Sequence, residues 1–204
     1  MKKIMMIAAM MIAAVSANAQ NEVGQITLQP KAGINISTIT GDYNDKKAKV
    51  GLVAGVEAEY GVAENFGISA GVLYSMQGVK ASEQLLGGKL DVTYKMDYIN
   101  IPVLAQYYVV PGLAIKAGIQ PGFKASAKVT AKASANGETA KDSENLEDVQ
   151  GFALSIPFGL SYEYEGFVFD ARYNLGVTKA FKDSWGTNSK HSWFMFTIGY
   201  KFAL

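Results

Sequence analysis

The chain has 204 residues, of which 49% are hydrophobic and 18% are charged, and its formal net charge is +1. The hydrophobic content excludes disorder throughout, and the near-neutral balance argues against a nucleic-acid surface, which needs a basic stripe. The absence of cysteine excludes a disulfide framework, a thiolate metal site and a cysteine nucleophile. The length suits one domain or two small ones, and the 21 glycines, 11 tyrosines and 10 phenylalanines favour β structure.

The first 19 residues have the three parts of a secretory signal peptide. Two lysines follow the initial methionine, residues 4–15 are apolar, and Ala17-Asn18-Ala19 is a small-x-small cleavage site. The apolar run is shorter than the ~20 residues that a transmembrane helix needs. We therefore expect residues 1–19 to be cleaved and residues 20–204 to form one exported domain.

Apolar residues alternate with polar or small ones throughout the exported part of the chain. In the first such segment, Ile34 and Ile36 share one face and Asn35 lies on the other. A period of two predicts half-buried β-strands. The pattern recurs in eight segments: residues 26–37, 50–61, 66–77, 90–109, 113–128, 151–164, 167–178 and 192–202. In the fourth segment the apolar phase switches near Tyr98 and Ile99, which predicts a β-bulge.

The connections between these segments alternate between long and short. The long, polar ones are residues 38–48, 79–89, 129–148 and 179–191, and the short ones are residues 62–65, 110–112 and 164–166. Long loops on one side and short turns on the other are typical of outer-membrane barrels. Every second strand also ends in aromatic residues suited to the inner membrane interface: Tyr60, Tyr107, Tyr162, Tyr164, Tyr200 and Phe202.

These patterns predict an all-β fold, an eight-stranded antiparallel up-and-down transmembrane β-barrel in the bacterial outer membrane. Residues 20–204 are then one outer-membrane β-barrel domain, with both termini on the short-turn side. A soluble, lipocalin-like barrel is the alternative. Its interior would have to hold the bulky apolar face, whereas an eight-stranded interior is only just wide enough for side chains. More than half of the glycines lie on the polar face, which suits a crowded interior.

Several segments resemble the PorT-type outer-membrane β-barrel family of Bacteroidetes. They are KAGINIST (31–38), YINIPVLAQYY (98–108), DARYNLGVTKAF (170–181) and FTIGYKF (196–202). Val177 stands where that family often has leucine. The resemblance implies an eight-stranded outer-membrane barrel, and some members of the family support protein secretion or gliding.

The polar face of the predicted strands collects charged residues. They are Lys31, Glu57, Glu59, Lys116, Lys124, Lys128, Glu163, Asp170, Arg172 and Lys201. Two interpretations stay open, a polar path for a solute and an ion-pair network that fills a narrow lumen. We favour the network, because small barrels are filled by side chains and buried charges must be paired. Arg172 is expected to bond at least one of Glu57 and Glu59.

We predict no catalytic, cofactor or metal site, and we expect the protein not to be an enzyme. His191 and Ser192 are adjacent, so in a strand they would point to opposite faces and could not easily form a nucleophile–base pair. We expect His191 to be a solvated loop residue. Asp42, Asn44 and Asp45 loosely resemble a Ca²⁺ cluster but lack EF-hand spacing, and a polar turn is the preferred interpretation.

The expected function is structural or interaction-based: envelope integrity, adhesion or support of a secretion complex. Passage or binding of a small solute through the barrel is the alternative, and an outer-membrane lipid-modifying enzyme is the third candidate. The expected partners are outer-membrane lipid and an envelope protein bound through loops 38–48, 129–148 and 179–191, with no nucleic acid and a monomeric barrel. Residues 129–148 have an excess of acidic residues and are expected to be mobile or to form an extended hairpin.

Overall fold

The computed structural model describes residues 22–40, 46–85, 88–135, 138–145, 149–178 and 190–204. Its strands are β1 (Ile26–Thr40), β2 (Lys46–Ala63), β3 (Phe66–Leu85), β4 (Gly88–Asn100), β5 (Val103–Val110), β6 (Leu113–Ala135), β7 (Glu138–Asn145), β8 (Phe152–Tyr164), β9 (Phe167–Gly176), β10 (Lys190–Tyr200) and β11 (Phe202–Ala203). Among the described residues there is no helix long and apolar enough to span a membrane. The expected signal peptide lies outside the described residues.

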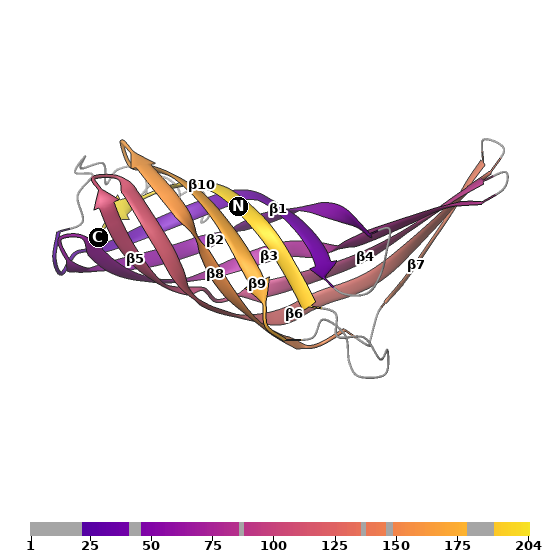
Figure 1. The fold of residues 1–204 in the computed structure, drawn as a ribbon, viewed down its shortest axis with the longest axis horizontal. Coiled ribbons are helices and arrows are strands. Elements are labelled where there is room, and N and C mark those ends of the chain that lie inside the picture. Colours follow the sequence, from indigo (N-terminus) through magenta and orange to yellow (C-terminus); the bar gives the residue numbers. More distant parts are fainter. Residues whose placement is uncertain (1–21, 41–45, 86–87, 136–137, 146–148, 179–189) are drawn as a thin grey trace, which may run out of the picture.

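The strands close into an antiparallel ring with eight strand positions (Figure 1). β1, β2 and β3 pair in sequence, and β4 and β5 together occupy the position between β3 and β6. β6 pairs with β8, β8 with β9 and β9 with β10, and β10 returns to β1. The predicted eight-stranded antiparallel fold is therefore confirmed.

The fourth predicted strand, residues 90–109, is divided into β4 and β5. The division falls at Ile101 and Pro102, where proline has no N–H to donate to the sheet. The pairing with β3 nevertheless keeps one register, because Leu73 faces Asn100 and Ala70 faces Val103. The two elements are thus one interrupted strand.

The bulge predicted near Tyr98 and Ile99 is not in that strand. The register shift lies opposite it, where Ala125 is an extra residue on β6 between the partners of Asp97 and Tyr98. A bulge is therefore not the reason why the apolar residues of β4 change from one face to the other. Met96 and Tyr98 face inward and join a buried apolar cluster, while Asp97 lies on the outward side.

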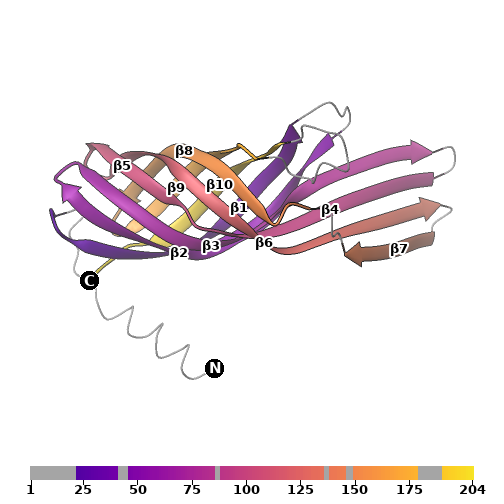
Figure 2. The same cartoon turned by 90° about the horizontal axis from the view of Figure 1, so that it is seen from below.

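Three strands of the ring continue beyond it at the end that carries the long connections, and β7 joins them there. β3, β4, β6 and β7 pair side by side there and form a sheet that projects from the barrel (Figure 2). We call this the projecting sheet; it comprises residues 79–85, 88–95, 128–135 and 138–145. The prediction of a long loop over residues 79–89 is therefore wrong. Residues 129–148 adopt the extended-hairpin alternative over their described part.

The opposite end of the ring has short turns and holds the C-terminus (Figure 1). The N–H of Leu204 donates to the carbonyl of Ile26 at 2.9 Å, which ties the last described strand to the first. Exposed tyrosines surround this end at the positions expected for an interface belt: Tyr60, Tyr107, Tyr162 and Tyr164. Tyr200 is half-buried, and its ring packs against Phe167 and Phe202.

The two faces of the ring have opposite character. β9 shows the pattern, because Phe167 and Phe169 are exposed while Val168, Asp170 and Arg172 are buried. Around the ring, large apolar side chains occupy the outward positions, and the inward positions carry most of the buried polar and charged side chains together with a smaller set of apolar ones. A soluble barrel would have the reverse arrangement, so the observed faces suit lipid outside and a filled lumen inside.

Inward-facing glycines allow neighbouring strands to approach closely. A Cβ at Gly33 would collide with the carbonyl oxygen of Phe196, and one at Gly159 would collide with that of Ala171. Both contacts are with backbone atoms of the adjacent strand, which cannot move aside as a flexible side chain can. This explains why small residues gather on the inner face.

Candidate functional site

Five charged side chains from four strands meet inside the barrel. Arg172 on β9 donates from its two terminal nitrogens to the two carboxylate oxygens of Glu57 on β2, at 2.6 and 2.7 Å, and its Nη2 also lies 2.6 Å from Oδ2 of Asp170. Lys31 on β1 donates to Glu57 at 2.8 Å and to Asp170 at 3.4 Å. Lys116 on β6 donates to Asp170 at 3.1 Å. We call these residues the central network.

The central network is buried and links distant parts of the ring. None of its side chains is more than 3% exposed. The expected bond between Arg172 and Glu57 is present, in the bidentate geometry that gives strong charge-assisted hydrogen bonds. Because charged groups from β1, β2, β6 and β9 meet at one level, they obstruct the lumen there.

A second group of charges lies towards the short-turn end. Lys201 is 2.6 Å from Glu163 and 3.1 Å from Glu59, and it donates to the hydroxyl of Tyr108 at 3.1 Å. That hydroxyl donates to Glu59 at 2.6 Å. Tyr108 was not among the residues predicted for the lumen, because it falls in the segment whose apolar phase changes. We call these four residues the lower network.

Apolar side chains also fill the lumen. Val53, Leu73, Trp193 and Met195 form a buried cluster. Met195 lies opposite Arg172 across β10 and β9, so the cluster is next to the central network. The sequence places Trp193 and Met195 on the inward face, but the alternation alone does not show that they pack together.

Two lysines predicted for the lumen do not join either network. Lys124 donates to the carbonyl of Val149 at 3.2 Å. Lys128 is exposed on the projecting sheet, so its predicted lumen position is wrong. The extra residue Ala125 shifts the alternation of β6 by one position, which turns Lys128 outward and Ala127 inward.

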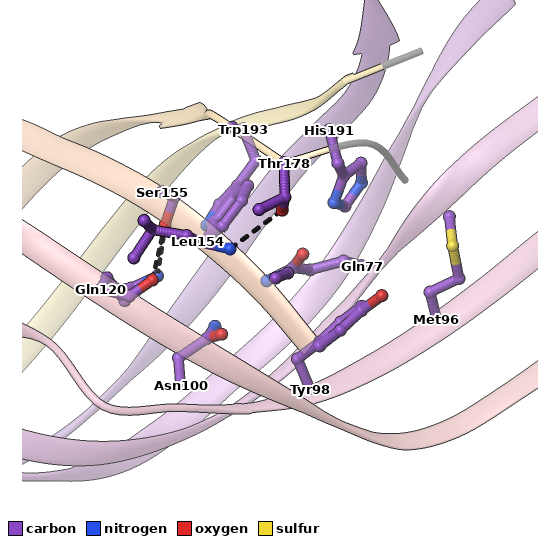
Figure 3. A pocket seen from close by; sticks show the side chains of 12 residues that line it. Gln77, Met96, Tyr98, Asn100, Gln120, Leu154, Ser155, Thr178, His191 and Trp193 are labelled. Atoms are coloured by element: carbon purple, nitrogen blue, oxygen red, sulfur yellow. Dashed lines mark hydrogen bonds between the residues drawn. The ribbon is translucent and has the colours of Figure 1, made fainter. Parts of the chain in front are cut away.

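A small pocket lies on the long-loop side of the central network (Figure 3). Gln120, Ser155, Trp193 and His191 are among the side chains that line it, and Gln120 Nε2 donates to Ser155 Oγ at 3.4 Å. The cavity volume is about 20 Å³, which holds one or two water molecules. Within the described ranges, His191 Nε2, Trp193 Nε1 and Gln120 Oε1 have no hydrogen-bond partner. These polar atoms suit bound water.

His191 differs from its prediction as a solvated loop residue. It belongs to β10, is 8% exposed and lies with its ring centroid 5.5 Å from that of Trp193. Its neighbour Ser192 accepts a hydrogen bond from the N–H of Gly176 at 3.3 Å. The described residues contain no group of three His, Cys, Asp or Glu placed to hold a metal. Asp42, Asn44 and Asp45 lie outside the described residues, as do residues 179–189.

Comparisons with known proteins agree with this architecture. A family model described as an outer membrane protein beta-barrel domain matches residues 18–182. No curated protein matches the chain.

Solved structures with a similar fold include the following three. The attachment invasion locus protein Ail of Yersinia pestis is 17% identical, with 89% of this chain and 100% of that chain covered and a TM-score of 0.47. Neisserial surface protein A is 12% identical, with 92% and 100% covered and a TM-score of 0.47. OprG of Pseudomonas aeruginosa is 14% identical, with 91% and 98% covered and a TM-score of 0.39.

Proposed function

This chain belongs to the outer membrane protein beta-barrel domain family, and we propose on that premise that its barrel is a closed membrane anchor for the projecting sheet. The family assigns the chain to the outer membrane. The role proposed for it is interaction at the cell surface, as in adhesion or attachment to another envelope component. The long-loop end, which carries the projecting sheet, is then the outer side.

The observation that carries this proposal is the pairing of every charge in the central network across the lumen. A solute could pass only by separating Arg172 from Glu57 and Asp170, which would leave charges buried without partners. The barrel therefore has no evident use as an open channel. The projecting sheet, by contrast, exposes polar side chains such as those of Lys132, Lys141 and Asp142.

The finer features of the proposal have support from the sequence. The first 19 residues support export through a signal peptide, and segments such as residues 98–108 support the PorT-type subgroup. We further propose that the barrel is monomeric, that it has no enzymatic activity, and that an envelope protein binds to its long connections. Solute passage stays the alternative, and the conductance of the barrel distinguishes the two.

Removing the projecting sheet is expected to abolish function while the barrel still folds. Residues 81–92 and 131–142 are each replaced by Asn-Gly, which joins Lys80 to Thr93 and Thr130 to Ser143. Each of these pairs is already opposite in the sheet, and Asn-Gly favours a two-residue hairpin turn. In a deletion strain of the native host, the full chain should restore surface attachment and detergent resistance, and the truncated chain should fail.

The control is the amount of folded barrel in the outer membrane, measured by heat-dependent gel mobility. It should be equal for the two chains. If the truncated chain restores both phenotypes as well as the full chain does, the barrel itself is the functional part and the proposal is wrong.

A further inference from the structure

The register of the projecting sheet separates its charges by face. Lys95 faces Lys128 across β4 and β6, and Lys132 faces Lys141 across β6 and β7. Because side chains alternate along a strand, these positions share one face with Lys80 on β3, which faces Thr93. We call this surface the lysine face. Its exposed lysines are Lys80, Lys95, Lys128, Lys132 and Lys141.

Acidic residues of β7 are on the other side of the sheet. Asp142 faces Ala131 and Glu144 faces Val129, so both carboxylates alternate away from Lys141. Both are exposed. Asp91 does lie on the lysine face, opposite Lys132. In the described part of the chain, none of the five lysines forms an ion pair.

The unpaired lysines on one face destabilise the projecting sheet. Like charges directly opposite each other on neighbouring strands are destabilising, and the lysine face contains two such pairs, Lys95 with Lys128 and Lys132 with Lys141. Moving Asp142 and Glu144 by one residue along β7 would have placed both on the lysine face, with one of them directly opposite a lysine. A bound polyanion would offset the repulsion, because each lysine would then face an opposite charge.

The distance from the membrane indicates which kind of anion can reach the lysines. The last large apolar side chain on the outward face of β4 is Ile99, which is 41% exposed. Lys95 lies four residues further out, about 13 Å along the strand, or about 10 Å of rise at a tilt of about 40°. The headgroup layer adds only about 5–8 Å to each side of the hydrocarbon core. Lys132 and Lys141 lie further out again.

We propose that the lysine face binds an extended anionic polysaccharide, one with sulfate or carboxylate groups along its chain. Successive lysine rows, at Lys128, Lys80 and Lys132, span about 13 Å along the strands, so a polymer can contact several rows at once. A lipid headgroup would reach only the nearest row. The proposal rests on the proposed function, since it requires the projecting sheet to be outside the cell.

The experiment measures binding of dextran sulfate to the whole barrel in nanodiscs of neutral lipid, with unsulfated dextran as the matched polymer. Polygalacturonate serves as a carboxylated probe. The variant K132Q/K141Q removes one lysine pair, and D142N/E144Q changes two charges on the opposite face of the same strand. A second pair, K80Q/K95Q, tests the face independently.

We expect dextran sulfate to bind, dextran not to bind, and binding to weaken as salt rises. K132Q/K141Q and K80Q/K95Q should each weaken dextran sulfate binding by at least about fivefold, because each removes two exposed charge contacts. D142N/E144Q should not weaken it. Polygalacturonate should follow the same order of variants if carboxylates also suffice, and its failure to bind would narrow the ligand to sulfated chains.

Three results would overturn the proposal: no binding of either polyanion, equal binding by the lysine variants, or equal binding of neutral dextran. Binding of the lysine face only to vesicles that contain phosphatidylglycerol would also overturn it, in favour of a headgroup. These outcomes are separate from the proposed function. A truncated chain that loses attachment while dextran sulfate does not bind the full chain would leave the sheet functional with a different partner.

Discussion

Replacement of Arg172 by alanine is expected to lower the free energy of unfolding by about 3–5 kcal/mol, the usual cost of removing one partner from a buried ion pair. Arg172 supplies both hydrogen bonds to the two oxygens of Glu57 and a third to Asp170. Lys31 and Lys116 would remain, but neither has the planar fork that matches a carboxylate. Urea unfolding of the barrel in lipid vesicles, followed by tryptophan fluorescence, measures the loss.

Two further variants make this result specific to the central network. The exposed Lys128 is the matched control, and Lys128→Ala should change the unfolding free energy by less than about 0.5 kcal/mol. The double variant Arg172→Met with Glu57→Gln should lose less than the sum of the two single variants, because the partners are coupled. An unchanged stability for Arg172→Ala would show that the network does not hold the lumen together.

Placing arginine at Phe196 is expected to destabilise the barrel by about 2–4 kcal/mol, the cost of a cation on the lipid face at the bilayer midplane. Phe196 is 43% exposed on β10, between Ile34 on β1 and Ala171 on β9. Phe194 and Ile198, its neighbours on the same face of β10, are also exposed and apolar, so we expect Phe196 to face lipid. The same urea unfolding experiment measures the effect.

The matched control is Val110→Arg, because Val110 is exposed beside the short turn between β5 and β6. At that interface an arginine should cost only about 0–1 kcal/mol. If Phe196→Arg is as well tolerated as Val110→Arg, the outer apolar face meets water, and the barrel is not arranged as a membrane protein.

The strands and their faces could be predicted from the sequence because alternation is a local signal. In β9 each side chain follows the period of two, and the contact of Arg172 with Glu57 followed from the charges on the inward faces. The closing of the ring could be predicted as well, because an even number of antiparallel strands allows the first strand, β1, to pair antiparallel with the last long one, β10.

Only part of the projecting sheet could be predicted, namely the extended hairpin that was one of two alternatives for residues 129–148. The extension of β3 and β4 could not, because these strands lie beyond the membrane there and lose the apolar half of the pattern. Lys80 and Lys95 occupy outward positions that would carry phenylalanine or isoleucine in lipid. Polar strands of this kind look like loops in a sequence. β3, β4 and β6 extend past the ring because they pair with one another and with β7, and not because their sequences are locally hydrophobic there.

Details of the lumen depended on single residues that change the alternation. The extra residue Ala125 reverses the faces of β6, which explains the wrong position of Lys128. The inward position of Tyr108 was not predicted because apolar residues flank it, and His191 was predicted to lie in a loop because a polar segment precedes it. In each of these cases, pairing with the neighbouring strand decides whether the side chain points inward or outward. The sequence of a single strand does not contain that information.

The proposed function requires a closed lumen, and single-channel conductance measures directly whether the lumen is closed. The chain from residue 20 to residue 204 would be refolded and inserted into a planar bilayer, with insertion verified by protection from protease. We predict no discrete current steps from inserted protein, because the central and lower networks fill the lumen. Discrete steps of constant size would show that the lumen is open and would favour passage of a small solute.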